Sequence, residues 1–303
     1  MAGFQTASRK KAKLRLGVIG PSGSGKTMSS LLIAYGITGD WNKIGLVDTE
    51  RGSGELYAGS AVGEQQIGDY QVLTLQPPYE PEKYIQAIKL AEAAGLECVI
   101  LDSLSHAWAG EGGLLDRHDK ITKASKSGNS YTAWRDITPL HNRLIDAMLS
   151  SPLHVIATMR SKTEYVQEES GGKKVVRKVG MAPVQREGMD YEFTVVIELT
   201  QDHIAVASKD RTSLFDGKYF TPASDTGLTL KGWLETGTDP DTEAKEKGLA
   251  FCHAKAADRG MNHDELKALA GEIFGRCNSM TDLSLAQLRK LGKILNEQKA
   301  SGE

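Results

Sequence analysis

Short apolar runs alternate with segments of helical spacing along most of the chain. The apolar runs predict buried strands at residues 14–20, 43–50, 71–75, 97–103, 153–160, 192–199 and 203–211. Between them, apolar residues recur at helical spacing over 29–35, 81–95 and 131–149. Strands and helices that alternate in this way form right-handed crossovers. The pattern therefore predicts an α/β fold with a mostly parallel central sheet flanked by helices.

The composition shifts after Trp233. Residues 236–241 have the composition of a linker, and three helices are expected after it. Asn262 and Glu265 form a capping-box-like pair at the start of the second helix. A leucine stripe on the third helix is more typical of a core than of a partner groove. We predict a flexible arm over 1–13, a core over 14–236 and a small three-helix module over 237–303.

The overall charge gives no sign of a nucleic-acid or membrane partner. The net charge is −2 over 303 residues, of which 40% are hydrophobic. No apolar run is long enough to span a bilayer, and no apolar stretch of a signal peptide follows the basic N-terminus. The three cysteines form no C-x-x-C pair, which argues against disulfides and a zinc site. We therefore expect a soluble protein of the cytoplasm.

A glycine-rich turn follows the first predicted strand. It matches G-x-x-x-x-G-K-[ST], a pattern in which backbone N–H groups surround phosphate oxygens and a lysine contacts the β- and γ-phosphates. The positive N-terminus of the next helix points at the same phosphates. We therefore expect ATP and Mg²⁺ as cofactors. The predicted nucleotide-binding residues in this loop are Gly20, Pro21, Ser22, Gly23, Ser24, Gly25, Lys26, Thr27 and Met28.

Asp102 ends a four-residue apolar run, as the aspartate of a Walker B strand does. A carboxylate at this position helps to hold the Mg²⁺ that the threonine hydroxyl of the glycine-rich loop binds. Thr27 and Asp102 are therefore the predicted metal residues. The alternative is an aspartate that only caps a turn at the end of a strand.

Residues 48–58 carry a more specific signal, because Asp48-Thr49-Glu50 is followed by Tyr57-Ala58. The segment resembles the one in RecA-family recombinases in which Asp-Ala-Glu at a strand end precedes Tyr-Ala, and the spacing to Asp102 is similar. The resemblance implies that Glu50 is the base that orients the attacking water and that Tyr57 stacks on adenine. A carboxylate can accept a proton from water, and a flat aromatic face suits a purine. Ordinary core packing remains open for Tyr57.

Arg160 closes the strand expected at residues 153–160. In RecA-like proteins the polar residue at this place senses the γ-phosphate and passes its state to a DNA-binding loop. It is usually glutamine in the bacterial proteins, so the arginine is a departure. A cation here can stabilise phosphate charge directly.

Positive charge concentrates in two segments of this mildly acidic chain. Residues 110–130 have the composition of an exposed loop or frayed helix, and residues 165–179 that of a hairpin turning at Ser-Gly-Gly. In the resembled family a disordered loop at the second place meets DNA, so a hairpin is a departure. A solvated edge strand guarded by lysines is the alternative. The predicted DNA-binding residues are Lys120, Lys123, Lys126, Lys173, Lys174, Arg177 and Lys178.

Lys209 and Arg211 lie at the end of a late antiparallel pair of strands. RecA-like cores place two basic residues there that reach the ATP of the neighbouring protomer, and such residues act like an arginine finger. The alternative is a pair of solvated surface charges. The predicted catalytic set is Glu50, Lys26, Arg160, Lys209 and Arg211.

The N-terminal Gly3-Phe4-Gln5-Thr6-Ala7 resembles the Phe-x-x-Ala motif with which eukaryotic and archaeal recombinases of this family bind the next subunit. Phe4 and Ala7 are therefore predicted oligomerisation residues, with a disordered tail as the alternative. Such a head-to-tail contact propagates into a ring or a filament.

Residues 14–233 are similar to phage-encoded RecA-like ATPases of the Sak single-strand-annealing group. This resemblance implies ATP hydrolysis that single-stranded DNA stimulates, a role in homologous recombination or strand annealing, and a single-strand-binding protein as a further partner. A phage protein of this kind acts in the host cytoplasm. The second class of function that stays open is a nucleotide-gated assembly or motor ATPase of the packaging or partitioning type, whose partner is protein.

Overall fold

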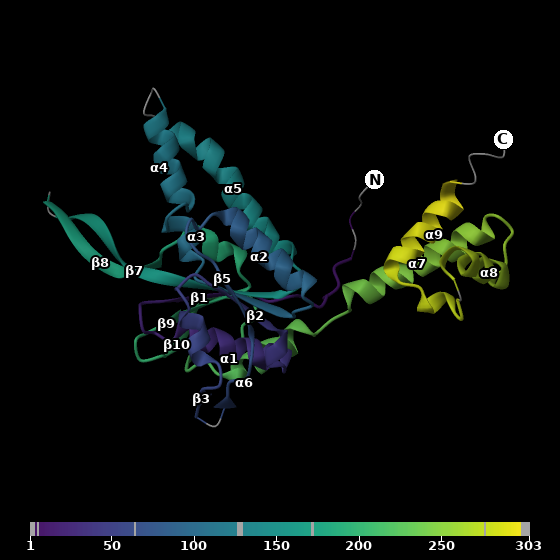
Figure 1. Cartoon of the computed structure of the whole chain (residues 1–303), viewed down its shortest axis with the longest axis horizontal. Coiled ribbons are helices and arrows are strands. Elements are labelled where there is room, and N and C mark those ends of the chain that lie inside the picture. Colours follow the sequence, from purple (N-terminus) through teal and green to yellow (C-terminus); the bar gives the residue numbers. More distant parts are fainter. Residues whose placement is uncertain are drawn as a thin grey trace. The chain divides into compact units, whose positions relative to one another are not determined.

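A sheet of mostly parallel strands lies at the centre of residues Lys13–Leu234 (Figure 1). The computed structural model describes residues 4, 6–63, 65–125, 130–170, 173–275 and 277–297. Within them the strand order is β11-β10-β9-β1-β7-β6-β2-β5, with β8 paired to β7 and a separate β3-β4 ribbon. The strands are β1 Arg15–Gly20, β2 Ile44–Asp48, β3 Ala61–Val62, β4 Gln65–Gln66, β5 Gln71–Thr74, β6 Cys98–Asp102, β7 His154–Ser170, β8 Lys173–Pro183, β9 Val195–Leu199, β10 Ala205–Asp210 and β11 Tyr219–Phe220.

The strands from β9 to β5 in this order run parallel to one another. Every residue of β1, β2 and β6 is buried, as is typical of parallel strands that are covered on both faces. β10 and β11 pair antiparallel at the other side of the sheet. The predicted α/β fold with a mostly parallel sheet is confirmed.

Helices cover both faces of the sheet (Figure 1). α1 and α6 pack on one face, where Leu31 and Leu230 join the buried cluster of β1 and β2 side chains. α2 and α5 pack on the other face, where Tyr84 and Leu144 join a second buried cluster. The helices of this part of the chain are α1 Lys26–Thr38, α2 Pro81–Ala93, α3 Ser105–Ala109, α4 Leu114–Ala124, α5 Ser130–Ser150 and α6 Ser224–Leu234, with 3₁₀ turns at Trp41–Lys43, Ser53–Tyr57 and Met189–Glu192.

Glycines allow α1 and α6 to approach closely. A Cβ on Gly36 would collide with the backbone of α6, and a Cβ on Gly227 would lie 2.9 Å from the Cα of Gly36. This contact fixes α1, the helix that follows the glycine-rich loop, against the C-terminal end of the core.

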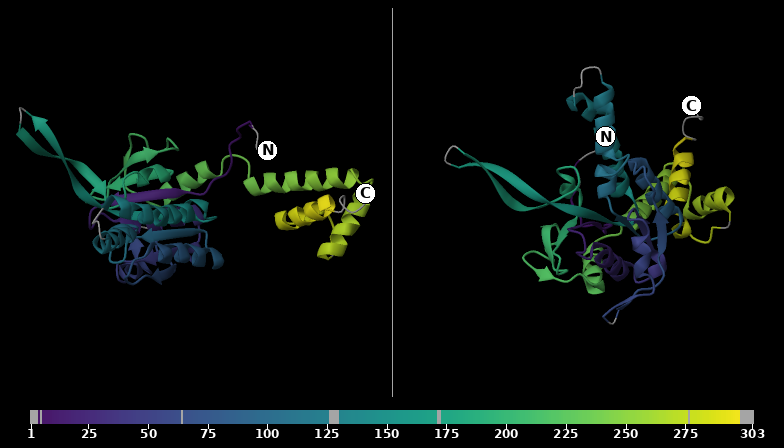
Figure 2. Two further views of the ribbon diagram at one scale, coloured as in Figure 1. Left: turned by 90° about the horizontal axis from the view of Figure 1, so that it is seen from above. Right: turned by 60° about the vertical axis from the view of Figure 1, so that its left-hand side comes forward.

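β7 is longer than the sequence analysis predicts. The prediction that a strand closes at Arg160 is wrong, because β7 continues through Arg160 to Ser170 and pairs with β8 in antiparallel register. The predicted hairpin is therefore confirmed, and it is an uninterrupted extension of a central strand. Figures 1 and 2 show the hairpin projecting away from the sheet.

Residues 110–130, for which an exposed loop or a frayed helix was predicted, contain a helix, α4. α4 is held by Leu114 and His118, which are buried, and it packs along the N-terminal half of α5. A charged surface with few apolar positions hid this helix, because two buried residues per three turns give a weak periodic signal.

Residues from Glu235 onward form a second unit together with the first twelve residues. Its helices are α7 Pro240–Ala257, α8 His263–Phe274 and α9 Leu285–Glu297, with a 3₁₀ turn at Met280–Asp282. The predicted capping box of Asn262 and Glu265 is confirmed at the start of α8. Leu288, Leu291 and Leu295 are buried with Cys252, so the leucine stripe forms a core.

Part of the N-terminal arm pairs with the segment before α7. Lys10 forms a parallel bridge with Thr238, and Lys11 N donates to the Thr238 carbonyl at 2.9 Å. Lys10 Nζ also lies 3.0 Å from a carboxylate oxygen of Glu243. Sequence patterns could not find this pairing, because its partners are more than 220 residues apart and are too short to show strand periodicity.

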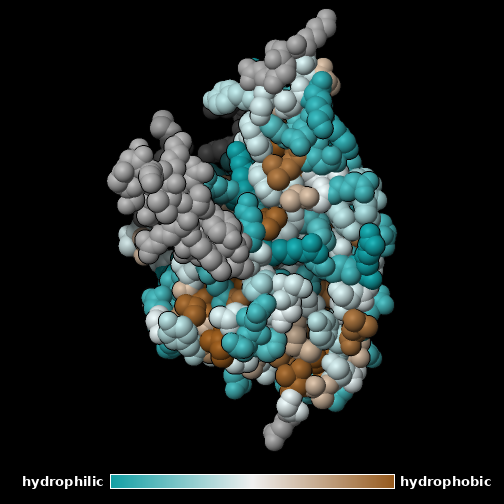
Figure 3. All heavy atoms as spheres, turned by 90° about the vertical axis from the view of Figure 1, so that its left-hand side faces the viewer, coloured by the Kyte–Doolittle hydropathy of each residue, from teal (hydrophilic) through white to brown (hydrophobic). Residues whose placement is uncertain are grey.

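All three cysteines are free, as the sequence predicted. Among the described residues, we find no helix with the length and hydropathy needed to cross a bilayer. On the face seen in Figure 3, apolar residues are scattered among hydrophilic ones.

Candidate active site

The glycine-rich loop between β1 and α1 provides an open cradle for an anion. Gly23 and Gly25 have φ values of 77° and 83°, which side-chain-bearing residues rarely adopt. Gly25 is the N-cap of α1, so the first turn of this helix has no side-chain cap on its N–H groups. A helix N-terminus in this state attracts phosphate through its free N–H groups and its dipole. The structure thus gives residues 20–27 the local geometry that phosphate binding requires.

Lys26 lies across this loop, and its Nζ donates to the Pro21 carbonyl oxygen at 2.8 Å. Burial lowers the pKa of Lys26, while the carboxylates of Asp102 and Glu50 act in the opposite direction. The ammonium is therefore close to both predicted acidic residues. An anion with several oxygens would offer it stronger partners than one carbonyl group.

Asp102 is buried at the end of β6 and accepts two hydroxyl hydrogen bonds. Thr27 Oγ1 donates to Oδ2 at 2.5 Å, and Thr158 Oγ1 donates to Oδ1 at 2.5 Å. Burial raises the pKa of Asp102, and the two hydroxyl groups partly oppose this effect. Asp102 and Thr27, the two residues predicted to bind the metal, are thus in direct contact. Its second partner, Thr158, was missed, although it lies two residues before Arg160 on β7 and so points to the same side.

The donor set at Asp102 suits Mg²⁺. A carboxylate and a hydroxyl oxygen are hard ligands, and Mg²⁺ is typically held by one or two such groups together with substrate phosphates. Thr27 and Asp102 would hold the ion. Among the residues that the structure describes, no group of three or more His, Cys, Asp or Glu side chains could form a metal cage by itself.

Glu50 lies beyond β2, and its carboxylate is paired with Arg160. Arg160 Nη2 lies 2.6 Å from each Glu50 oxygen, and its Nε donates to Oε1 at 3.0 Å. Two side chains that were predicted separately therefore form one bidentate pair. Both are partly exposed, so the pair is accessible to a ligand at the loop.

Asp48 holds the backbone that carries Glu50. Its buried carboxylate accepts from Glu50 N and from Gly52 N, each at 2.6 Å. This turn fixes the chain just past the end of β2. Asp48 is therefore a structural residue of the site, a role that the sequence analysis did not assign.

A buried polar network lies behind Glu50. Thr49 Oγ1 accepts from Ser103 N at 2.8 Å and lies 2.7 Å from His106 Nδ1. Burial lowers the pKa of His106, and the nearby Arg160 lowers it further. The Tyr79 ring stacks on this imidazole with centroids 4.8 Å apart. These contacts connect the ends of β2 and β6, and His106 was missed because an isolated histidine gives no periodic signal.

His203 is a further residue that the sequence analysis missed. It lies in the turn between β9 and β10 with a φ of 63°, and a Cβ built on Gly25 would lie 3.0 Å from its Nδ1. Positive φ is uncommon for a residue with a side chain. The turn therefore places an imidazole directly beside the glycine-rich loop.

Tyr57 packs partly buried against the core cluster on the α1 face of the sheet. This contact corresponds to the packing alternative. Stacking on adenine stays a prediction.

Lys209 and Arg211 do not lie at the glycine-rich loop of their own chain. β10 is antiparallel to β9, so Asp210 is level with Val195 and, through β9, with Leu16 at the start of β1. Lys209 Nζ donates to the carbonyl oxygens of Asp190 and Tyr191, at 2.8 and 2.6 Å, and Arg211 Nη2 donates to the latter at 3.0 Å. The two cations thus lie at the opposite end of the strands from Gly20.

The predicted DNA-binding residues lie on two different elements. Lys120 and Lys123 are exposed on α4, and Lys120 forms an ion pair with Asp116 at 2.9 Å. Lys173, Lys174, Arg177 and Lys178 lie along the backbone of β8. Lys126 lies outside the described residues.

Phe4 and Ala7 are both exposed. Within the part of the chain that the structure describes, Phe4 is therefore not a core side chain, and its ring is accessible to another molecule.

A family model described as an AAA domain matches residues 12–226. The match covers more than half of the chain and includes the glycine-rich loop, Asp102 and the Glu50–Arg160 pair. No curated protein matches the chain.

Proposed function

The chain belongs to the family of AAA domains, and from this premise we propose that it is an ATPase that acts on single-stranded DNA in phage homologous recombination or strand annealing. AAA domains are P-loop ATPases, which agrees with the loop at residues 20–27. The main support for the proposal is that three groups lie together at the carboxyl ends of the parallel strands. They are Lys26, the Thr27–Asp102 pair and the Glu50–Arg160 pair. These are the groups that phosphoryl transfer to water requires.

Each group has a chemical task in ATP hydrolysis. Lys26 would bind the β- and γ-phosphates, and Thr27 and Asp102 would hold Mg²⁺, which would supply positive charge to the phosphate oxygens. Glu50 accepts a proton from the attacking water. Arg160 holds the Glu50 carboxylate before the nucleotide arrives, and an incoming γ-phosphate offers the guanidinium a second anion.

The course of β7 supports a role on DNA. This strand carries Thr158 and Arg160 at the site and then continues without a break into the projecting hairpin (Figure 1). A movement of Arg160 would thus be transmitted along one strand to the hairpin. The hairpin carries Lys173, Lys174, Arg177 and Lys178. The recombination role itself rests on the resemblance of residues 48–58 to RecA-family recombinases, and a single-strand-binding protein is part of the same proposal.

Neutralising the hairpin tests the DNA contact. We expect Lys173→Gln combined with Lys174→Gln to weaken oligonucleotide binding and to flatten its salt dependence, by roughly 0.7 in the log–log slope for each phosphate that is no longer neutralised. Fluorescence anisotropy of a labelled oligonucleotide over a salt series measures both effects. The control is Lys290→Gln with Lys293→Gln, which removes the same charge from exposed positions of α9. Equal slopes for the two double variants would make β8 a solvated edge strand.

Head-to-tail assembly is the second part of the proposal. Lys209 and Arg211 lie at the opposite end of the strands from their own phosphate loop. They would therefore reach a nucleotide only in a neighbouring protomer. Acting in trans, they would supply positive charge to the transition state.

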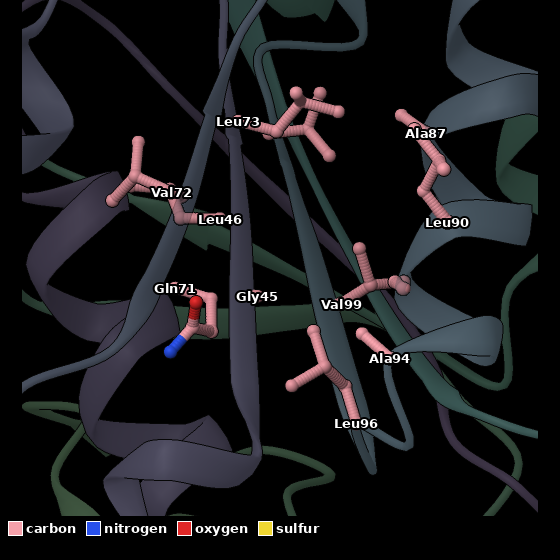
Figure 4. A pocket seen from close by; sticks show the side chains of 12 residues that line it. Gly45, Leu46, Gln71, Val72, Leu73, Ala87, Leu90, Ala94, Leu96 and Val99 are labelled. Atoms are coloured by element: carbon pink, nitrogen blue, oxygen red, sulfur yellow. The ribbon is translucent and has the colours of Figure 1, made fainter.

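An apolar pocket beside β5 suits Phe4 of a neighbouring copy. Its volume is about 140 Å³, and Figure 4 shows Leu73 of β5 and Ala87 and Leu90 of α2 facing it. A cavity of about 150 Å³ lined by apolar side chains accepts a benzene ring. β5 ends the order of the main sheet, so within the described residues its outer edge has no strand partner and can accept an extended segment.

Phe4→Ala and Leu90→Glu are therefore both expected to reduce assembly in the presence of ATP and single-stranded DNA. Burying a phenyl ring contributes roughly 2 kcal/mol, which corresponds to an association that is about 30-fold weaker without it. Sedimentation velocity measures the distribution of species, with Leu149→Glu as a control at a half-exposed leucine outside the pocket. A wild type that stays monomeric would rule out trans catalysis, whereas full assembly of both variants would rule out only the Phe4 contact.

The alternative function is a nucleotide-gated assembly or motor ATPase with a protein partner. It predicts ATP hydrolysis that single-stranded DNA leaves unchanged. Stimulation by DNA that declines steeply with salt favours the recombination proposal.

A further inference from the structure

A cleft with aromatic walls lies beside the base of the hairpin, and none of the residues predicted from the sequence belongs to it. Its volume is about 500 Å³. The walls come from α3, from α5 and from the segment between β8 and β9. The lining residues are Trp108, Trp134, Arg186, Glu187, Gly188 and Tyr191.

The two tryptophans present their rings nearly parallel to each other. Their centroids are 5.9 Å apart and their planes differ by 21°. Both side chains are only partly buried. The buried His118 of α4 packs against Trp134 with centroids 4.2 Å apart, and His141 meets the edge of Trp108. The indole rings are therefore held by neighbouring side chains while part of their surface stays accessible from the cleft.

Cations lie beside two of the aromatic rings. The Arg186 guanidinium lies 5.8 Å from the centre of the Trp134 ring and donates to Thr138 Oγ1 at 3.2 Å. In the same segment as Arg186, Tyr191 is 71% exposed, and Lys209 Nζ lies 5.7 Å from its ring centre. A base that stacks on these rings would also meet cations suited to its phosphates.

Acidic groups offset these cations. Glu187 lines the cleft, and Asp190 and Glu192 lie close enough to Lys209 to affect its pKa, which burial lowers. Phosphate attraction alone is therefore a weak reason for binding here. The flat, partly exposed rings are the feature that selects a ligand, and every nucleobase has a matching flat face.

The cleft is continuous with the hairpin. β8 ends at Pro183, and the next residue, Val184, donates its N–H to the Arg160 carbonyl at 2.7 Å. Gln185 Nε2 then donates to the Leu104 carbonyl, just before α3, at 3.3 Å. Arg186 follows directly, so a strand of nucleic acid that follows the hairpin arrives at the aromatic rings.

We propose that the cleft of Trp108, Trp134, Arg186 and Tyr191 binds a base of single-stranded nucleic acid by stacking. This inference rests on the proposed function, because it needs a strand bound at the hairpin. It adds a contact to the base itself, whereas the lysines of β8 would contact phosphate.

The test compares two oligonucleotides of equal length and charge, a polythymidine strand and a strand of abasic sites, at fixed salt with ATP and Mg²⁺. Their affinities are measured for the wild type, for Tyr191→Ala and for Trp134→Leu. Tyr219→Ala is the control, because it removes an exposed aromatic ring from β11, outside the cleft. Tyr191 is exposed, so its replacement keeps the fold even where loss of Trp134 disturbs α4 and α5.

We expect the wild type and Tyr219→Ala to bind the thymidine strand about 10-fold or more tightly than the abasic strand. The ratio should fall toward one in Tyr191→Ala and Trp134→Leu. An unchanged ratio in both cleft variants overturns the inference and leaves the proposed function standing. A wild type that binds neither strand overturns both. Unchanged DNA affinity with a loss of assembly in Tyr191→Ala identifies the cleft as a protein contact and also overturns the inference.

Discussion

We expect Lys26→Ala to weaken ATP binding by about 10²-fold and to reduce turnover below detection. The side chain crosses the glycine-rich loop, where its Nζ donates to the Pro21 carbonyl oxygen, a neutral acceptor. Hydrogen bonds to charged groups contribute about 1.5–3 kcal/mol each, and a lysine between two phosphates makes more than one. Equilibrium binding of a fluorescent ATP analogue measures the first effect, and phosphate release measures the second.

Lys89→Ala is the matched control, because Lys89 is an exposed lysine on α2. It removes the same charge and a similar length of side chain without touching the loop. ATP binding by Lys26→Ala at the affinity of this control would show that residues 20–27 do not bind the nucleotide.

Glu50→Gln is expected to have the second large effect. We expect ATP still to bind and turnover to fall by about 10²-fold or more, since an amide of the same shape cannot accept a proton from water. Asp48 anchors the backbone at Glu50 N and Gly52 N, so the substitution leaves the turn in place. Single-turnover hydrolysis separates this chemical step from binding.

Glu55→Gln provides the control, because Glu55 is an exposed carboxylate in the following 3₁₀ turn. The Arg160→Ala variant then reports on the bidentate pair. If Arg160 acts only by holding Glu50, combining the two substitutions costs no more than Glu50→Gln alone. Hydrolysis at the wild-type rate by Glu50→Gln would mean that another group is the base.

Features encoded in contiguous residues could be predicted from the sequence. The glycine-rich loop, the apolar run before Asp102 and the capping box at Asn262 each depend on neighbours within a few positions. The fold class followed from the alternation of strands and helices, which is a property of the whole core and tolerates errors at single boundaries. The hairpin could also be predicted, because Ser170-Gly171-Gly172 separates two runs with strand character.

Contacts between distant residues could not be predicted. Glu50 and Arg160 have separate roles in the sequence analysis, and only the parallel sheet brings them within 2.6 Å. Thr158 is a partner of Asp102 because β6 and β7 are adjacent. His203 reaches the glycine-rich loop through a turn whose positive φ no composition rule indicates.

One prediction was wrong because the local pattern ends an element too early. A charged residue such as Arg160 usually follows a buried run at the end of a strand, but in β7 the same strand leaves the core and continues into the hairpin. The charged surface of α4, with Leu114 and His118 buried, gives a helical periodicity too weak to separate a helix from a loop. Trp108 and Trp134 are single aromatic residues in the sequence, and their relation depends on how α3 and α5 meet.

The most direct test of ATP-dependent action on single-stranded DNA is one titration of a labelled oligonucleotide with the full-length protein, with and without ATP and Mg²⁺. We expect binding that ATP and Mg²⁺ strengthen and that weakens steeply as salt is raised. Failure to bind the oligonucleotide at low salt, with ATP and Mg²⁺ present and ATP hydrolysis intact, would contradict the proposal and favour an ATPase with a protein partner.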